Sequence, residues 1–115
     1  MFDISHLPER TSRPRQNGLT MVMDKGLSLR QAEDLIETGS DLVDFLKLGF
    51  GTSIITPKVA EKTKLYRDAG FDVYCGGTLF EAFYVRNEVD NYLRYIDKMG
   101  IECLEVSDGS MAVSY

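Results

Sequence analysis

The chain has 115 residues, 43% of them hydrophobic, which is enough for one domain with a core and too few for two. Its 13 basic and 18 acidic residues give a net charge of −5, which disfavours nonspecific binding to nucleic acid or to an anionic membrane surface. No apolar run approaches the length of about 20 residues that spans a bilayer, and the N-terminus lacks the apolar block of a signal peptide, so we expect a cytoplasmic protein.

Residues 1–17 contain Pro8, Pro14 and three arginines without any helical or strand period, so we predict an irregular N-terminal arm. Arg13 and Arg15 could reach back toward an anionic ligand. Basic residues in proline-containing termini are more often exposed, so we favour a solvated tail.

Residues 19–23 are predicted to form the first strand, with Asp24 and Lys25 at its C-terminal end. Ser28 and Gln31 then fit a capping box, in which the two side chains satisfy backbone donors at the start of a helix. This helix is expected to end at Gly39.

The second predicted strand, residues 42–48, is almost continuously apolar, as expected for a parallel strand covered on both faces. Lys47 interrupts it, and a lysine in such a strand must lie at an open end or be paired. A loop with two glycines follows, and Thr56 and Pro57 are predicted to begin the next helix as its N-cap and first residue.

Residues 71–75 are predicted to form the third strand, and a fourth is expected over residues 102–106, after a helix that begins at Val89. Thr78 and Glu81 fit a second capping box, so Thr78 is either a helix cap or part of a site. Cys75 and Cys103 both fall in these strands without the spacing of a zinc site, and we predict two buried, reduced thiols.

The strands begin about 24 to 30 residues apart with a helix between each pair, which is typical of βαβ units with parallel strands. Four such units make half of an eight-stranded barrel and leave two exposed edges, which proteins normally remove by closure or pairing. We therefore predict an α/β fold of the TIM (β/α)8-barrel type, with residues 18–115 as its N-terminal half, and we expect a homo-oligomer.

Parallel strands would gather polar residues at one end of the sheet, where α/β proteins usually carry their chemistry. Carboxylates there are candidate Mg²⁺ ligands, lysines could hold an anion, and the glycine loops and hydroxyls could add donors. Each signal alone is weak, since a Lys-Asp pair or a Gly-Gly turn is often structural, and the prediction depends on their repetition. The candidates are Asp24, Lys25, Lys47, Gly49, Gly51, Thr52, Gly76, Gly77, Thr78, Glu105, Ser107 and Asp108.

Four segments in the same order and spacing resemble the phosphosulfolactate synthase family. They are LTMVMDKG at residues 19–26, DFLKLGFGTS at 44–53, YCGGTLFE at 74–81 and LEVSDGS at 104–110. The resemblance spans nearly the whole chain after the arm, but only the N-terminal half of a family member.

The resemblance implies a TIM-barrel lyase that uses Mg²⁺ to add sulfite to phosphoenolpyruvate, giving (2R)-3-phosphosulfolactate, an early step of coenzyme M biosynthesis in methanogens. It implies Lys25 and Lys47 as catalytic residues at the anions. Glu105 and Asp108, with Asp24 as a further candidate, would hold the metal. Substrate binding would fall to the loop residues Gly49, Gly51, Thr52, Gly76, Gly77, Thr78 and Ser107.

Three functions remain open at this point. The first is this synthase, although the family's proton-transfer lysine and phosphate cup would lie in the second half of the barrel. The second is a noncatalytic interaction protein of the same family, with the role in stress tolerance that the resemblance to plant members suggests. The third is another barrel enzyme in which Lys47 forms a Schiff base with a phosphorylated carbonyl compound.

Overall fold

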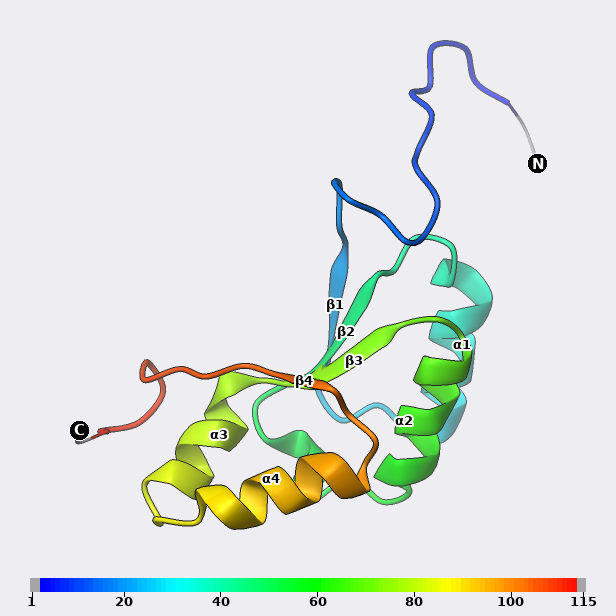
Figure 1. Ribbon diagram of the computed structural model, residues 1–115. Coiled ribbons are helices and arrows are strands. Elements are labelled where there is room, and N and C mark those ends of the chain that lie inside the picture. The colour runs from blue at the N-terminus through cyan, green and yellow to red at the C-terminus, as the bar shows by residue number, and fades with distance from the viewer. Residues whose placement is uncertain (1–2, 114–115) are drawn as a thin grey trace.

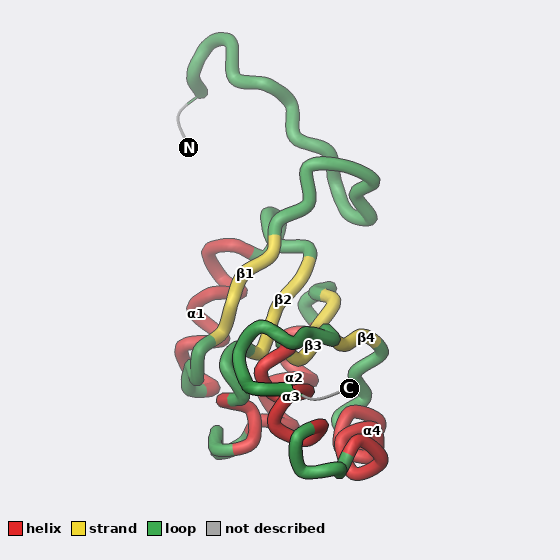
Figure 2. The backbone as a smooth tube through the Cα atoms, turned by 90° about the vertical axis from the view of Figure 1, so that its left-hand side faces the viewer, coloured by secondary structure: helices red, strands yellow, loops and turns green. Residues whose placement is uncertain are grey.

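The computed structural model describes residues 3–113, which form four short strands and four α-helices, with one α-helix after β1, one after β2 and two between β3 and β4 (Figure 1). The strands β1 to β4 form one sheet in sequence order, every neighbouring pair being parallel (Figure 2). The elements are β1 (Met21–Asp24), α1 (Leu29–Gly39), β2 (Phe45–Leu48), the short 3-10 helix η1 (Thr52–Ile54), α2 (Val59–Asp68), β3 (Asp72–Cys75), α3 (Gly77–Tyr84), α4 (Val89–Lys98) and β4 (Cys103–Leu104). The α/β class and the parallel βα repeat are thus confirmed, whereas a closed barrel stays a prediction.

The hydrophobic core lies between the sheet and the helices packed on one of its faces (Figure 1). Leu46, Leu48, Val73 and Cys75 point into it and are at most 5% exposed. Side chains of opposite parity, such as Phe45 and Lys47, are only partly buried, which is the alternation expected when one face of a strand meets the core. No helix of the described chain, residues 3–113, is long and apolar enough to cross a bilayer.

The start of α1 forms as its sequence predicts. The Ser28 hydroxyl accepts the N–H of Gln31 at 3.2 Å, and the Gln31 side chain accepts the N–H of Ser28 at 2.9 Å, so the capping box is confirmed. The helix also ends at Gly39 as expected.

Two other predicted helix starts are wrong. Lys58, not Thr56, is the N-cap of α2, and the Thr56 hydroxyl instead donates to the carbonyl of Thr52 at 2.6 Å. Gly76 is the N-cap of α3 and no side chain caps it, so Thr78 lies inside the helix rather than before it. In both places the hydroxyl that fits a cap in the sequence bonds elsewhere: Thr56 bonds within its own turn, and Thr78 bonds the distant Ser110.

The predicted strands are longer than those observed, and β4 keeps only Cys103–Leu104 of residues 102–106. Cys75 is buried, but Cys103 is exposed, so the prediction of two buried thiols is wrong for Cys103. Cys103 lies on the outermost strand, in register with Tyr74 on the face that points away from the main core, and this position leaves it open to solvent.

The arginines of the N-terminal segment bind the start of β2 instead of lying free in solvent. Arg15 forms an ion pair with Asp44 at 2.7 Å, and its side chain is 3% exposed. Arg13 donates to the carbonyl of Val43 at 3.0 Å and lies over the ring of Phe71. The expectation of a solvated tail is therefore wrong for these two residues, because carbonyls and a carboxylate before β2 attract them.

A buried ion pair joins the end of β1 to α2. Lys62 Nζ lies 2.9 Å from Asp24 Oδ2, and the two side chains are 2% and 0% exposed. Tyr66 donates to the same oxygen at 2.8 Å, while the N–H groups of Gly26 and Leu27 donate to Oδ1. Burial alone raises the pKa of Asp24, but Lys62 and these backbone donors outweigh it and hold the pKa below the usual range.

We expect Lys62→Met to lower the free energy of unfolding by about 3 kcal/mol at neutral pH, since it leaves a buried carboxylate without its cation. The Asp24 pKa is lowered in the folded protein, so its stabilisation is complete above the usual aspartate pKa of about 4 and is lost as the pH falls through the lower, folded value. The difference between variant and parent should therefore shrink in acid. Chemical denaturation at neutral and acidic pH measures both effects.

Lys64→Met is the matched control on the same helix, because Lys64 pairs with Asp68 while the side chains are 76% and 63% exposed. We expect this control to change stability by less than about 1 kcal/mol. Equal losses in the two variants would show that the buried pair does not hold β1 and α2 together.

Candidate functional site

A hollow of about 170 Å³ lies at the C-terminal ends of β1 to β4, where the loops after the strands meet. The residues around it come from all four βα units, as expected for a site at this end of a parallel sheet. They are Met23, Lys47, Phe50, Gly76, Gly77, Thr78, Glu105, Ser107 and Ser110. A larger hollow of about 920 Å³ opens at the other end of the sheet, but it contains none of the predicted site residues.

Lys47 and Glu105 form the charged centre of the hollow. Lys47 Nζ lies 3.0 Å from Oε2 and 3.3 Å from Oε1 of Glu105, and the N–H of Gly77 donates to Oε1 at 3.1 Å. Lys47 and then the Gly77 N–H lower the pKa of Glu105 and keep this carboxylate ionised, although burial opposes them. The lysine in the apolar strand is therefore paired and also faces an open hollow.

Three glycines allow side chains to pass close to the backbone. A Cβ on Gly76 would lie 2.6 Å from Cε of Lys47, and one on Gly77 would lie 2.9 Å from Oε1 of Glu105 and overlap Ser107. A Cβ on Gly49 would lie 2.6 Å from Cγ of Met23. These positions exclude larger residues because a side chain already occupies the space.

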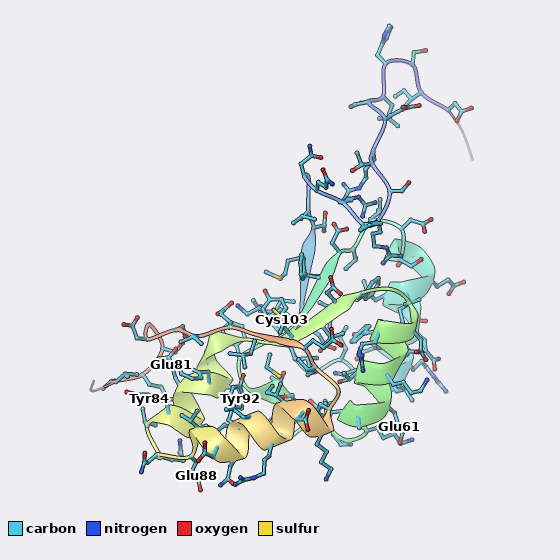
Figure 3. The ribbon with its side chains drawn as sticks, in the orientation of Figure 1. Glu61, Glu81, Tyr84, Glu88, Tyr92 and Cys103 are labelled. Atoms are coloured by element: carbon cyan, nitrogen blue, oxygen red, sulfur yellow. The ribbon has the colours of Figure 1, made fainter. Side chains whose placement is uncertain are left out.

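Glu81 is a site residue that the sequence analysis assigned only to helix capping. It is fully buried on α3, and its Oε1 accepts the N–H groups of Ser110 at 2.9 Å and Met111 at 2.8 Å. Its Oε2 accepts a hydrogen bond from the Ser107 hydroxyl. Glu81 thus holds the loop after β4 against α3 (Figure 3), and local sequence carries no signal for such a long-range contact.

The structure brings together half of the predicted site residues. Lys47, Gly76, Gly77, Thr78, Glu105 and Ser107 all line the hollow. The other six lie around it or away from it: Asp24, Lys25, Gly49, Gly51, Thr52 and Asp108.

Lys25 and Thr52 line a neighbouring groove beside the start of α1. The Thr52 hydroxyl donates to the carbonyl of Gly49 at 2.7 Å, so it closes its own loop. Lys25 Nζ lies 5.5 Å from the centre of the Phe50 ring, and Phe50 itself lines the hollow. Lys25 therefore contacts a ring that borders the hollow but does not line the hollow itself.

The three predicted metal carboxylates are not assembled in one place. Asp24 is fully buried and bonded to Lys62, Tyr66 and two backbone N–H groups, so its oxygens have no access to the hollow. Within residues 3–113 no group of three His, Cys, Asp or Glu side chains is placed to hold a metal ion. Glu105 borders the hollow, whereas Asp108 is exposed on the following loop and lines a different hollow with Val106 and Val113.

Comparison with known proteins assigns this chain to a family. The family described as (2R)-phospho-3-sulfolactate synthase (ComA) matches residues 8–115. Proteins named phosphosulfolactate synthase are 42% identical over 108 residues in Methanothermobacter thermautotrophicus and 45% identical over 101 residues in Methanocaldococcus jannaschii. A third, in Bacillus subtilis, is 36% identical over 115 residues.

The matches cover 92%, 86% and 99% of this chain but only 42%, 40% and 46% of these relatives, respectively. The chain therefore spans less than half the length of the curated relatives that it matches.

We expect Gly77→Ala to destabilise the fold by about 1–3 kcal/mol even though alanine is the better helix former, because the new methyl group overlaps Ser107 and crowds Glu105. Gly109→Ala is the control, since no atom lies within 4 Å of a Cβ at Gly109. Denaturant titration of both variants tests the difference. A Gly77→Ala protein as stable as the control would contradict the close approach described above.

Proposed function

This chain belongs to the (2R)-phospho-3-sulfolactate synthase family, and from this premise we propose that it carries part of the site of a lyase that joins sulfite to phosphoenolpyruvate. The observation that supports the proposal is the Lys47–Glu105 pair. Lys47 belongs to the family-like segment 44–53 and Glu105 to segment 104–110. The pair lies next to the glycines of a third such segment, 74–81, and all three segments line one hollow. The product would be (2R)-phospho-3-sulfolactate, with the sulfo group on C3, a precursor in coenzyme M biosynthesis, and the cytoplasmic location stays a prediction.

The proposed reaction adds sulfur to C3 of the enol phosphate. The sulfite lone pair forms the C–S bond, the C2–C3 π electrons move toward the carboxylate, and a proton is then delivered to C2. Lys47, a cation with three donors at the hollow, would stabilise the charge that develops on the substrate carboxylate. Glu105 would orient Lys47, because it holds the ammonium group at 3.0 Å.

Lys25 is the second proposed cation, but it lies in the neighbouring groove, beside the Phe50 ring. It would contact an anion that extends from the hollow past this ring. Gly76, Gly77 and Thr78 would border the substrate, while Gly49, Gly51 and Thr52 shape the loop after β2.

Mg²⁺ is the proposed cofactor, and Glu105 and Asp108 are the residues that would hold it together with water and substrate oxygens. When bound, the ion would supply a Lewis acid for the charge on the substrate carboxylate. Asp24 has no part in this site, since its carboxylate is committed to Lys62.

We further propose that β1 and β4 pair with additional strands, which would complete a (β/α)8 barrel. Both are outermost strands of the described sheet and carry unpaired backbone groups on one side. In the longer relatives the rest of the chain could supply these strands. For this chain alone, a second copy could supply them, since two parallel four-stranded sheets related by a twofold axis present complementary edges.

We expect this chain, with Mg²⁺ present, to consume phosphoenolpyruvate on addition of sulfite, and Lys47→Ala to reduce turnover by about 100-fold or more because one stabilising donor is lost. The same variant should lose less than about 1 kcal/mol of stability, since the Lys47–Glu105 pair is partly exposed. Lys64→Ala, an exposed lysine on α2, is the control and should leave turnover unchanged. Enzymatic detection of phosphoenolpyruvate follows the reaction.

The full-length Bacillus subtilis relative serves as the positive control for this assay. If the relative consumes phosphoenolpyruvate and the unmodified 115-residue chain does not, the proposed activity would be restricted to the longer protein. Trapping of Lys47 by borohydride in the presence of a phosphorylated carbonyl compound would favour the Schiff-base enzyme, since sulfite addition forms no imine.

If two copies close the sheet, we expect a species of twice the 13.0 kDa chain mass in sedimentation equilibrium. Met21→Pro should dissociate it, because the carbonyls of Thr20 and Asp24 accept from β2, so the N–H of Met21 points to the outer edge of β1, where a second copy would pair. A monomer at high concentration would contradict the pairing without affecting the proposed chemistry.

A further inference from the structure

Ser107 lies between a buried carboxylate and the hollow. Its hydroxyl donates to Oε2 of Glu81, while the residue itself lines the hollow next to Glu105. Thr78 and Ser110, whose hydroxyls are 2.9 Å apart, share one hydrogen bond on the same side, which leaves one of their two hydroxyl protons able to donate elsewhere. The direction of the Ser107 hydrogen bond decides what the part of the hollow next to Glu105 offers a ligand.

Glu81 acts only as an acceptor. Two backbone N–H groups, those of Ser110 and Met111, point at its Oε1, and an N–H group cannot accept a hydrogen bond in return. The Ser107 hydroxyl, followed by these backbone donors, holds the pKa of Glu81 below the usual glutamate range, so Glu81 is ionised at neutral pH. The only hydroxyl proton of Ser107 is thus committed to Glu81, and its lone pairs are left for the hollow.

The part of the hollow next to Glu105 consequently combines one cation with two acceptors. Lys47 supplies N–H donors, whereas Ser107 Oγ and the Glu105 carboxylate, which already accepts from Lys47 and the Gly77 N–H, present lone pairs. A fully ionised oxyanion bound to Lys47 would place its own lone pairs against these acceptors. An oxyanion that keeps one O–H group could instead donate that hydrogen to Ser107 or Glu105 while another oxygen contacts Lys47.

We propose that this hollow selects an oxyanion that carries one proton over a fully ionised oxyanion of the same charge and size, and that Glu81 is the positioning residue that sets this preference through Ser107. Hydrogen phosphate and hydrogen sulfite belong to the favoured class, and sulfate to the other. The proposal rests on the proposed function only in placing an oxyanion at the hollow, and it requires no turnover.

Inorganic phosphate and sulfate are the probes, measured by isothermal titration calorimetry without divalent cations at about pH 8, where phosphate is mainly HPO4²⁻ and so has the charge of sulfate. We expect phosphate to bind about tenfold more tightly than sulfate, the effect of one donor that finds a charged or polar acceptor. Equal affinities for the two ions, or no measurable binding of phosphate, would overturn the proposal.

Glu81→Gln tests the role of the carboxylate. The amide oxygen can still accept the two backbone N–H groups, but its NH₂ group now donates to Ser107 and turns the hydroxyl proton toward the hollow. The preference for phosphate should then fall to about twofold or less. Glu88→Gln, at an exposed carboxylate before α4 (Figure 3), is the matched control and should keep the full preference.

Amide hydrogen exchange at Ser110 and Met111 shows whether the loop stays in place in Glu81→Gln. If it does not, Ser107→Ala is the second variant, since it removes the acceptor and leaves the two backbone bonds to Glu81. Either variant with an ordered loop and an unchanged preference for phosphate would overturn the proposal. A chain that shows no synthase activity but still prefers phosphate over sulfate would contradict only the proposed synthase function and would leave the proposed oxyanion preference standing.

Discussion

The site depends on one close approach: Lys47 reaches Glu105 by crossing the end of β3 at a point where two glycines leave room. Lys47 belongs to β2 and Glu105 follows β4, so the strand between them has to carry no side chain where the pair forms. Gly76 makes way for the lysine and Gly77 for the carboxylate. The glycine loop is thus a steric requirement of the ion pair, whatever it contributes to ligand binding.

Two carboxylates at the C-terminal ends of strands, Asp24 as the last residue of β1 and Glu105 just after β4, have opposite surroundings. Asp24 follows the apolar part of β1 into the protein and is neutralised by Lys62 from α2, so it anchors the loop to a helix. Glu105 lies after β4 beside the hollow and pairs with a lysine from the sheet. A carboxylate at the end of a strand can therefore be a structural anchor or part of the hollow. Successive side chains of a strand point to opposite faces of the sheet, and this alternation decides which of the two environments the carboxylate enters.

The sequence was informative where the physics is local. The Ser28–Gln31 box, the order of strands and helices, and the parallel sheet follow from spacing, and the lysine in an apolar strand pointed to the ion pair. Thr56 was misassigned because the carbonyl of Thr52, four residues back, takes its hydroxyl hydrogen bond. Glu81 was misassigned because a capping pattern cannot show that a distant loop competes for the same side chain. The roles of Arg15 and Asp24 were missed for the same reason, since their partners lie 29 and 38 positions away in the chain. About half of the candidate site could be predicted, namely the part whose residues end neighbouring strands.

The exposed thiol of Cys103 is a site on this sheet for attaching a spectroscopic label. Cys103 is in register with Tyr74, which in turn is in register with Lys47, so the three side chains lie in one row on the same face. The other thiol, Cys75, is buried in the core, and burial raises its pKa to about 11, which makes it a poor competitor for alkylating reagents. A fluorophore or spin label attached at Cys103 would therefore report on the face that carries Lys47 without any engineered cysteine.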